Sequence, residues 1–153
     1  MNLSKVIERV ILTFWAVYFT LVLASNLTDV MAKLNLLPAE FKFVSGNYKL
    51  MEKVVAIYNT PAALVAVMFA GVLLLELFSA TAFWAAAFCF DAAKRRKWAE
   101  KGFCVSLTLW FGFIVADELF VAFDVADLER AHVAMLSCEL LSFLVYLKIR
   151  ART

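Results

Sequence analysis

Residues 60–90 read TPAALVAVMFAGVLLLELFSATAFWAAAFCF, and this stretch decides the fold class. As a helix it would be roughly 46 Å long at about 1.5 Å per residue, whereas a bilayer core of about 30 Å needs about 20 apolar residues. Glu76 is its single charged residue. The stretch therefore predicts a membrane-crossing helix that tilts or protrudes from the bilayer.

The composition of the whole chain supports a lipid environment. Hydrophobic residues make up 65% and charged residues 18% of the 153 residues, against about half and about a quarter in ordinary globular proteins. In water, 15 Phe and 4 Trp would leave large apolar patches exposed. Further apolar stretches at 10–25, 103–122 and 128–147 complete the set of spans. We expect an all-α integral membrane four-helix bundle in a single transmembrane domain, 1–153.

Basic residues predict the orientation of these spans. They cluster near both chain ends and between the second and third spans. Because cytoplasmic loops carry the excess of lysine and arginine, we expect cytoplasmic termini and outer segments at 26–59 and 123–127. The run KRRK then acts as a topology anchor, and no nucleic-acid partner is expected. The cytoplasmic set is Lys5, Arg9, Lys94, Arg95, Arg96, Lys97, Lys101, Lys148, Arg150 and Arg152, and the outer set is Lys33, Lys42, Lys49, Lys53 and Arg130.

The outer segment 26–59 is the longest predicted connection. It begins with NLTD, where Asn26 and Asp29 are expected to turn or cap the backbone as it leaves the membrane. Further along, NYKLMEKVVAIYN at 47–59 places apolar side chains on one helical face and charged ones elsewhere. This pattern predicts an amphipathic helix in the membrane interface. A helix that caps the bundle without touching lipid is the alternative.

Acidic side chains gather in VADELFVAFDVADLERAHV, residues 115–133, together with the single histidine of the chain. Spacings of three and seven residues place Glu129, His132 and Glu139 on one stripe of the fourth span. Two carboxylates and an imidazole are costly to expose to lipid. This stripe is therefore predicted to face protein or water.

Other acidic residues lie within the predicted spans. Asp117 and Glu118 lie in the outer part of the third span. Glu76 and Glu139 each lie about halfway along their spans, where an ionised carboxylate costs about 2.5–3.5 kcal/mol on insertion scales. These four residues form the predicted intramembrane polar set.

Three interpretations of these acids stay open. In the first, Glu76 and Glu139 are protonated and hydrogen-bond to each other or to nearby hydroxyl groups, as structural contacts between helices. In the second, the carboxylates relay protons or coordinate a cation along a wet path. In the third, ERAH supplies Glu129 and His132 to a metal site, with Glu118, Glu76 and Glu139 as further ligands. The candidate hydroxyl groups are those of Thr13, Thr20, Ser79, Ser137 and Ser142.

The number of histidines argues against metal and haem sites. Di-iron sites in four-helix bundles use two Glu-x-x-His motifs, and this chain has one histidine. The same number opposes bis-histidine haem within one chain. The four glycines form no phosphate-binding loop, and no Ser/His/Asp arrangement has its usual local motif. We therefore expect that the protein binds no cofactor and is not an enzyme.

Three stretches resemble a bacterial family of predicted small four-span integral membrane proteins of unknown function. These are ASNLTD at 24–29, ELFSATAFWAAAF at 76–88 and LWFGFIVADELF at 109–120. The resemblance covers most of the chain and implies a four-span plan and a bacterial inner membrane location. It also implies that the family's polar positions are Asn26, Asp29, Glu76 and Glu118.

These observations rank the candidate functions. Small residues recur at four-residue spacing in the second span, as Ala66 with Ala70 and Ala82 with Ala86, which lets helices approach closely. We therefore expect first an accessory or structural subunit that packs against other membrane protein subunits, or against itself, in lipid. Proton or cation handling through the intramembrane carboxylates is the alternative, followed by the carboxylate and histidine metal site.

Overall fold

The structure is a computed structural model that describes residues 3–122, 125 and 127–151. Within these residues all regular elements are helical, which confirms the all-α prediction. Among the described helices, four are long and apolar enough to cross a membrane: α1, α3, α4 and α5. The elements are α1 (Leu3–Lys33), α2 (Asn47–Val55), the short 3₁₀ helix η1 (Ala56–Tyr58), α3 (Ala62–Phe88), α4 (Ala92–Leu119) and α5 (Leu128–Arg150).

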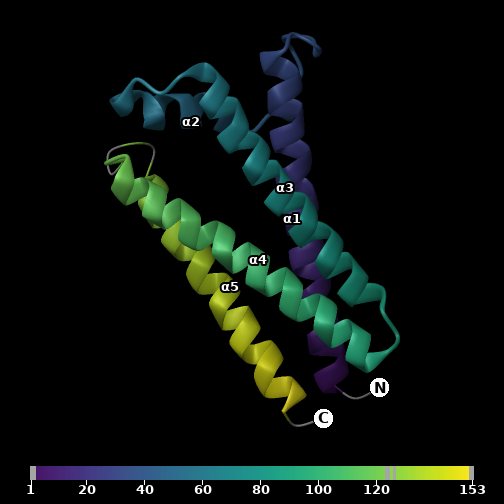
Figure 1. The fold of residues 1–153 in the computed structure, drawn as a ribbon. Helices are drawn as coiled ribbons and strands as arrows, with labels where there is room; N and C mark the ends of the chain where they lie inside the picture. The colour runs from purple at the N-terminus through teal and green to yellow at the C-terminus, as the bar shows by residue number, and fades with distance from the viewer. Residues whose placement is uncertain (1–2, 123–124, 126, 152–153) are drawn as a thin grey trace.

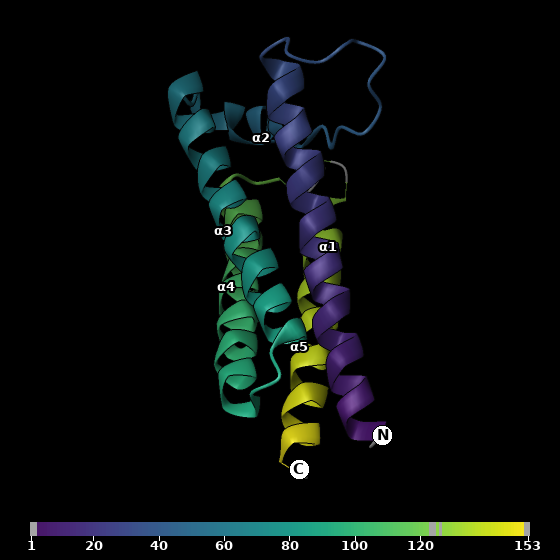
Figure 2. The same cartoon turned by 90° about the vertical axis from the view of Figure 1, so that its right-hand side faces the viewer.

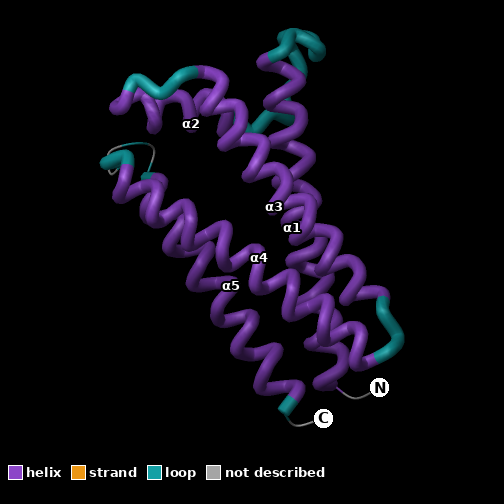
Figure 3. The backbone as a smooth tube through the Cα atoms, viewed as in Figure 1, coloured by secondary structure: helices purple, strands orange, loops and turns teal. Residues whose placement is uncertain are grey.

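The four long helices form two pairs, α1 with α3 and α4 with α5, and α3 also packs on α4 (Figure 1). The pairs lie close together at the end that carries both termini, which we call the terminal end. They diverge toward the opposite end, where α2 crosses the bundle, and we call this the capped end (Figures 1 and 2). The connections are short apart from the loop 34–46 (Figure 3). Of the predicted outer turn 123–127, the described residues include only Val125 and Asp127, and Arg152 also lies outside them.

α1 differs from the predicted first span at both of its ends. The helix continues through NLTD to Lys33, so the predicted turn at Asn26 and Asp29 is wrong. Both residues lie on the buried face of α1, 2% and 7% exposed. Their side chains have hydrogen-bond partners in other elements, described below. The backbone therefore keeps its helical hydrogen bonds where the composition becomes polar, and the outer loop shortens to 34–46.

α4 also begins earlier than the predicted third span. KRRK lies within its first turns, because Asp91 caps the helix at a position before the basic run. The Asp91 carboxylate accepts a hydrogen bond from the backbone N–H of Lys94, with 2.8 Å between Oδ1 and N. This hydrogen bond lowers the pKa of Asp91. The basic residues thus belong to a helix and not to an irregular link.

Aromatic side chains fill the core between the helices. Phe19, Phe83 and Phe103 from three helices are fully or almost fully buried, and the Phe83 and Phe103 rings pack edge to face with centroids 5.0 Å apart. Gly102 lies directly under the Phe83 ring, since an added Cβ would come within 3.0 Å of its Cε1. The absence of a side chain at this position allows α3 and α4 to approach closely.

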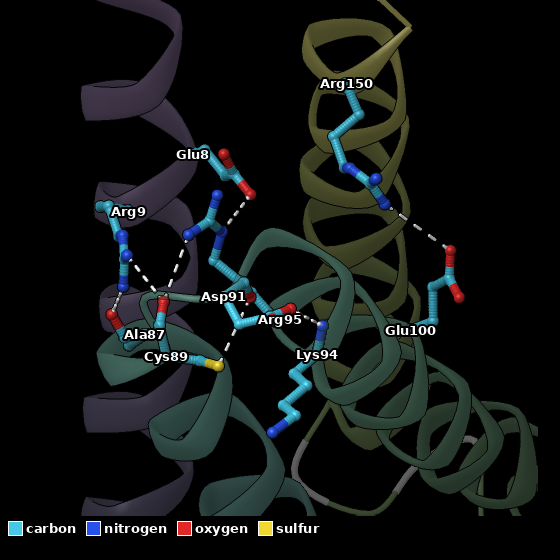
Figure 4. Close-up of polar contacts among 9 residues, drawn as sticks. All are labelled: Glu8, Arg9, Ala87, Cys89, Asp91, Lys94, Arg95, Glu100 and Arg150. Carbon is cyan, nitrogen blue, oxygen red and sulfur yellow. Dashed lines mark hydrogen bonds and ion pairs between the residues drawn. The ribbon is translucent and has the colours of Figure 1, made fainter. Parts of the chain in front are cut away.

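Two arginines connect three helices at the terminal end (Figure 4). The last carbonyl groups of an α-helix lack partners within the helix. Arg9 of α1 donates to the carbonyl oxygens of Ala87 and Cys89 at the end of α3, the latter at 2.8 Å from Nη2. Arg95 of α4 donates to the same Cys89 oxygen at 3.2 Å, and its Nε lies 2.9 Å from Oε1 of Glu8. We call Glu8, Arg9 and Arg95 the arginine clamp.

The two arginines of the clamp belong to the basic residues that predict the orientation of the spans, and they also stabilise the fold. Positive charge at the C-terminus of α3 interacts favourably with its helix dipole. The side chains of Arg95 and Glu8 are 12% and 8% exposed, so solvent screens their attraction weakly. Arg96, the next residue, pairs with Glu100 on the surface, where both side chains are far more exposed. This neighbouring pair provides a matched control.

We predict that Arg95→Gln lowers the thermal stability of the purified protein, because it leaves the buried Glu8 carboxylate without its charged partner. Breaking a buried pair costs about 3–5 kcal/mol, whereas a surface pair contributes about 1 kcal/mol or less. Arg96→Gln should therefore change the melting temperature much less, as measured by circular dichroism in the same detergent. Equal melting temperatures for the two variants would contradict the role of the clamp.

Candidate functional site

A cavity of about 270 Å³ lies in the capped half of the bundle. All five α-helices contribute to its wall. Apolar and aromatic side chains make up most of the wall, and a few polar groups converge on it. This combination is typical of small-molecule and ion sites in helical bundles. The polar members of the wall are Tyr18, Ser25, Asn26, Asn47, Glu76, Asp117 and His132.

Glu76 is the central acid of one wall. It is 2% exposed, and its Oε1 accepts a hydrogen bond from Nδ2 of Asn26 at 2.7 Å. Oδ1 of Asn26 in turn accepts from Nδ2 of Asn47 at 2.9 Å, which ties α2 to α1 and α3. The second carboxyl oxygen, Oε2, is buried and has no hydrogen-bond partner among the described residues. Glu76 therefore retains an unused acceptor at the cavity.

Asp117 and His132 form the acidic and basic pair of the other wall. Oδ2 of Asp117 lies 2.6 Å from Nδ1 of His132, which joins α4 to α5. Asp117 is 3% exposed, and the imidazole stacks on the Phe113 ring with centroids 4.8 Å apart. A hydrogen bond of this length fixes the orientation of the imidazole. Both residues face the same cavity as Glu76.

A second polar contact joins α4 and α5 nearer to the terminal end. Glu139 is fully buried, and its Oε1 accepts a hydrogen bond from the hydroxyl of Ser106. Ser106 and Asp117 lie on α4 opposite Glu139 and His132 on α5, so the two contacts are successive rungs between antiparallel helices. Glu139 is not part of the cavity wall.

The structure brings together some of the predicted site residues. Three of the four predicted intramembrane polar residues are buried, namely Glu76, Asp117 and Glu139, whereas Glu118 is exposed. Glu129 is exposed as well, although His132 from the same predicted stripe faces the cavity. Among the described residues, no three His, Cys, Asp or Glu side chains lie close enough to hold a metal ion. The predicted ligands Glu118, Glu129 and His132 are thus not gathered into one site.

The hydrogen-bond partners of the buried glutamates differ from the predicted ones. The sequence predicted a direct contact between Glu76 and Glu139 or hydroxyl partners from a set of five residues. Glu139 does accept from a hydroxyl group, but from Ser106, which is outside that set. Glu76 accepts from the amide of Asn26. Spacings of four, three and four residues place Ser106 on the same helical stripe as Trp110, Phe113 and Asp117, so this pattern was a usable signal. No such spacing marks Asn47. Its contact with Asn26 depends on how α2 packs against α1 in the folded protein.

α2 forms the lid of the cavity. Its apolar residues Leu50, Met51, Val54 and Val55 line the wall, as expected for a helix that caps the bundle. Its location in a membrane interface stays a prediction. At its far end, the Tyr58 hydroxyl of η1 donates to the Leu119 carbonyl oxygen at 2.9 Å, so the lid reaches from the α1 and α3 pair to α4.

Asp29 fixes the start of this lid. Its Oδ2 accepts hydrogen bonds from the Ser45 hydroxyl at 3.0 Å and from the backbone N–H of Tyr48 at 2.7 Å. The second contact satisfies one of the free N–H groups in the first turn of α2. Ser45 Oγ also accepts from the backbone N–H of Asn47 at 3.1 Å. Asp29 therefore acts as a cap supplied by another helix.

Comparisons of the chain with protein families, with curated proteins and with solved structures found no match.

We predict that Asp29→Ala loosens the lid, because the Tyr48 N–H and the Ser45 hydroxyl lose their shared acceptor. Amide hydrogen exchange of residues 45–55 should become faster, while exchange in α4 stays unchanged. Glu40→Ala, at an exposed position in the same connection, is the matched control and should leave exchange unchanged. Unaltered exchange in Asp29→Ala would show that the lid does not depend on this contact.

Proposed function

We propose that the protein is an integral membrane protein that handles protons or another cation at the cavity between Glu76 and the Asp117–His132 pair. The observation that carries this proposal is the unused Oε2 of Glu76, buried at a cavity that also contains Asp117 and His132. The geometry thus favours the alternative that the sequence analysis placed second. Glu76, Asp117 and His132 are the residues assigned to this role.

The physical argument is one of charge in a medium of low dielectric constant. Among the described residues, no lysine or arginine lines the cavity, and Asp117 already uses His132 as its partner. Glu76 is therefore either neutral with a bound proton or, when ionised, in need of a cation from outside the protein. Tyr18 of α1 also lines the cavity.

The location and orientation remain part of the proposal. The basic clusters at the terminal end support a cytoplasmic location of that end, under the positive-inside rule. The capped end, with its cavity, would then face the outer side. The resemblance to small bacterial membrane proteins supports the inner membrane as the location.

The test is ion flux in proteoliposomes. Purified protein is reconstituted with a pH-sensitive dye inside the vesicles, and a potassium gradient with valinomycin imposes a membrane potential. We expect protein-dependent proton flux, or cation flux measured with the matching dye. Glu76→Gln should abolish it, because the amide keeps the contact to Asn26 but cannot exchange a proton.

Glu118→Gln is the matched control for this experiment. It removes one carboxylate from α4 next to Asp117, yet Glu118 is exposed and does not line the cavity. Flux should persist in this variant. Equal flux in Glu76→Gln and in the unaltered protein would remove the basis of the proposal.

An accessory or structural subunit is the second candidate. Ala82 and Ala86 are buried within the bundle, so their small size serves internal packing. Ala66 and Ala70, by contrast, are exposed on α3 next to Val67, which is 67% exposed. Such a face suits close contact with another membrane helix. Lipid also covers such a face, so this candidate depends on finding a partner.

Native mass spectrometry in a mild detergent separates the two candidates. A stable complex with other membrane proteins would support the accessory role, and Glu76→Gln should leave that complex intact because the amide still hydrogen-bonds. A monomer or homo-oligomer would remove the support for this second candidate.

A further inference from the structure

We propose that the cavity binds an organic ammonium cation with an apolar or aromatic body, held by its N–H groups at Glu76 and by its body against the aromatic wall. The inference rests on the proposed function in one respect, namely that Glu76 receives a cation. It goes further by assigning the chemical class of that cation.

The size of the cavity excludes a bare ion as a complete occupant. Its volume of about 270 Å³ is far larger than the space for one water molecule, about 10–15 Å³ on the same kind of measure. A dry engineered protein cavity of about 150 Å³ holds a benzene molecule. The cavity therefore has room for a body of one or two rings. Most of its wall is apolar, which favours such a body over a cluster of water molecules.

The wall contains two acids, Glu76 and Asp117, and its buried atoms without a hydrogen-bond partner among the described residues are one acceptor and one donor, Oε2 of Glu76 and Nε1 of Trp110. The Nδ2 groups of Asn26 and Asn47 already donate within the protein, to Glu76 and to Asn26. Oε2 of Glu76 is buried and lacks a partner among the described residues. A ligand that donates hydrogen bonds fits these groups, whereas a carboxylate or phosphate would meet acceptors and negative charge. Hydrogen bonds between an ammonium and a carboxylate are also about twice as strong as neutral ones.

Aromatic rings of the wall supply a second attraction for the cation, besides the carboxyl group of Glu76. Five aromatic residues contribute to the wall, and the faces of such rings attract cations. The ring of Trp110 lies 6.2 Å from His132 and 6.5 Å from Tyr18, centroid to centroid, so it reaches between the polar group of one wall and the tyrosine of α1. The five are Tyr18, Phe69, Trp110, Phe113 and Phe120.

The test uses three probes of nearly equal shape and different charge. 1-Naphthylmethylamine is a cation at neutral pH, 1-naphthylmethanol is its neutral counterpart, and 1-naphthoate is an anion. Binding to the full-length protein in detergent is measured by equilibrium dialysis, and protein-free micelles correct for partition into detergent. We expect the ammonium to bind at least about tenfold more tightly than the alcohol, with no measurable binding of the anion.

Variants connect this selectivity to the cavity. Glu76→Gln should remove most of the preference for the ammonium over the alcohol, because the site then has no negative charge at this position. Glu118→Gln should retain the preference. Ala116→Phe places a ring in the cavity wall and should weaken binding of both the ammonium and the alcohol. The comparison of probes on the unaltered protein needs no variant, so it remains decisive even if a variant fails to fold.

Equal binding of ammonium and alcohol, tighter binding of the naphthoate, or full selectivity in Glu76→Gln would each overturn the inference. These results are independent of the flux experiment. Ion flux that depends on Glu76, without selective binding of the ammonium, would leave the proposed function standing and exclude this ligand class. Selective ammonium binding without any flux would support a binding site and contradict transport.

Discussion

The hydrogen bond between Nδ2 of Asn26 and Oε1 of Glu76 is the contact on which the capped half of the structure depends. A carboxyl group near the middle of an apolar helix needs a polar partner, because lipid offers none. Asn26 provides that partner and extends the contact through Asn47 to α2. The same residues that satisfy Glu76 therefore hold the lid over the cavity. The other oxygen of Glu76 has no hydrogen-bond partner among the described residues, because the asparagine contacts only Oε1.

The two halves of the bundle differ in how tightly their helices are packed. At the terminal end the helices are connected by the arginine clamp, and interlocking aromatic rings such as Phe83 and Phe103 fill the core. At the capped end the pairs diverge (Figure 1). The cavity wall there includes two buried polar atoms without a hydrogen-bond partner among the described residues, Oε2 of Glu76 and Nε1 of Trp110. The close packing of the terminal end offsets the cost of an incompletely filled cavity with buried polar groups in its wall. The arginine clamp and the aromatic core thus lie apart from Glu76.

The sequence predicted the helical class, the four apolar spans and most of the buried acids, because each depends on local composition and periodicity. It also predicted that Glu139 and His132 share a face. It did not predict that Ser106 and Asp117 lie opposite them, because periodicity assigns a residue to a face but does not set the register between two helices. The continuation of α1 through Asn26 was missed for a related reason. Its polar side chains read locally as a turn, and only their partners in the fold, Glu76 above all, make a helix favourable.

The most direct test of this account is covalent labelling with dicyclohexylcarbodiimide, an apolar reagent that adds to carboxyl groups, followed by peptide mass spectrometry. Glu76 and Glu139 are both buried and both lie in apolar helices, but only Glu76 lines the cavity. The account predicts that the reagent labels Glu76 much faster than Glu139. Similar labelling of the two residues, or labelling of Glu139 alone, would contradict a cavity centred on Glu76.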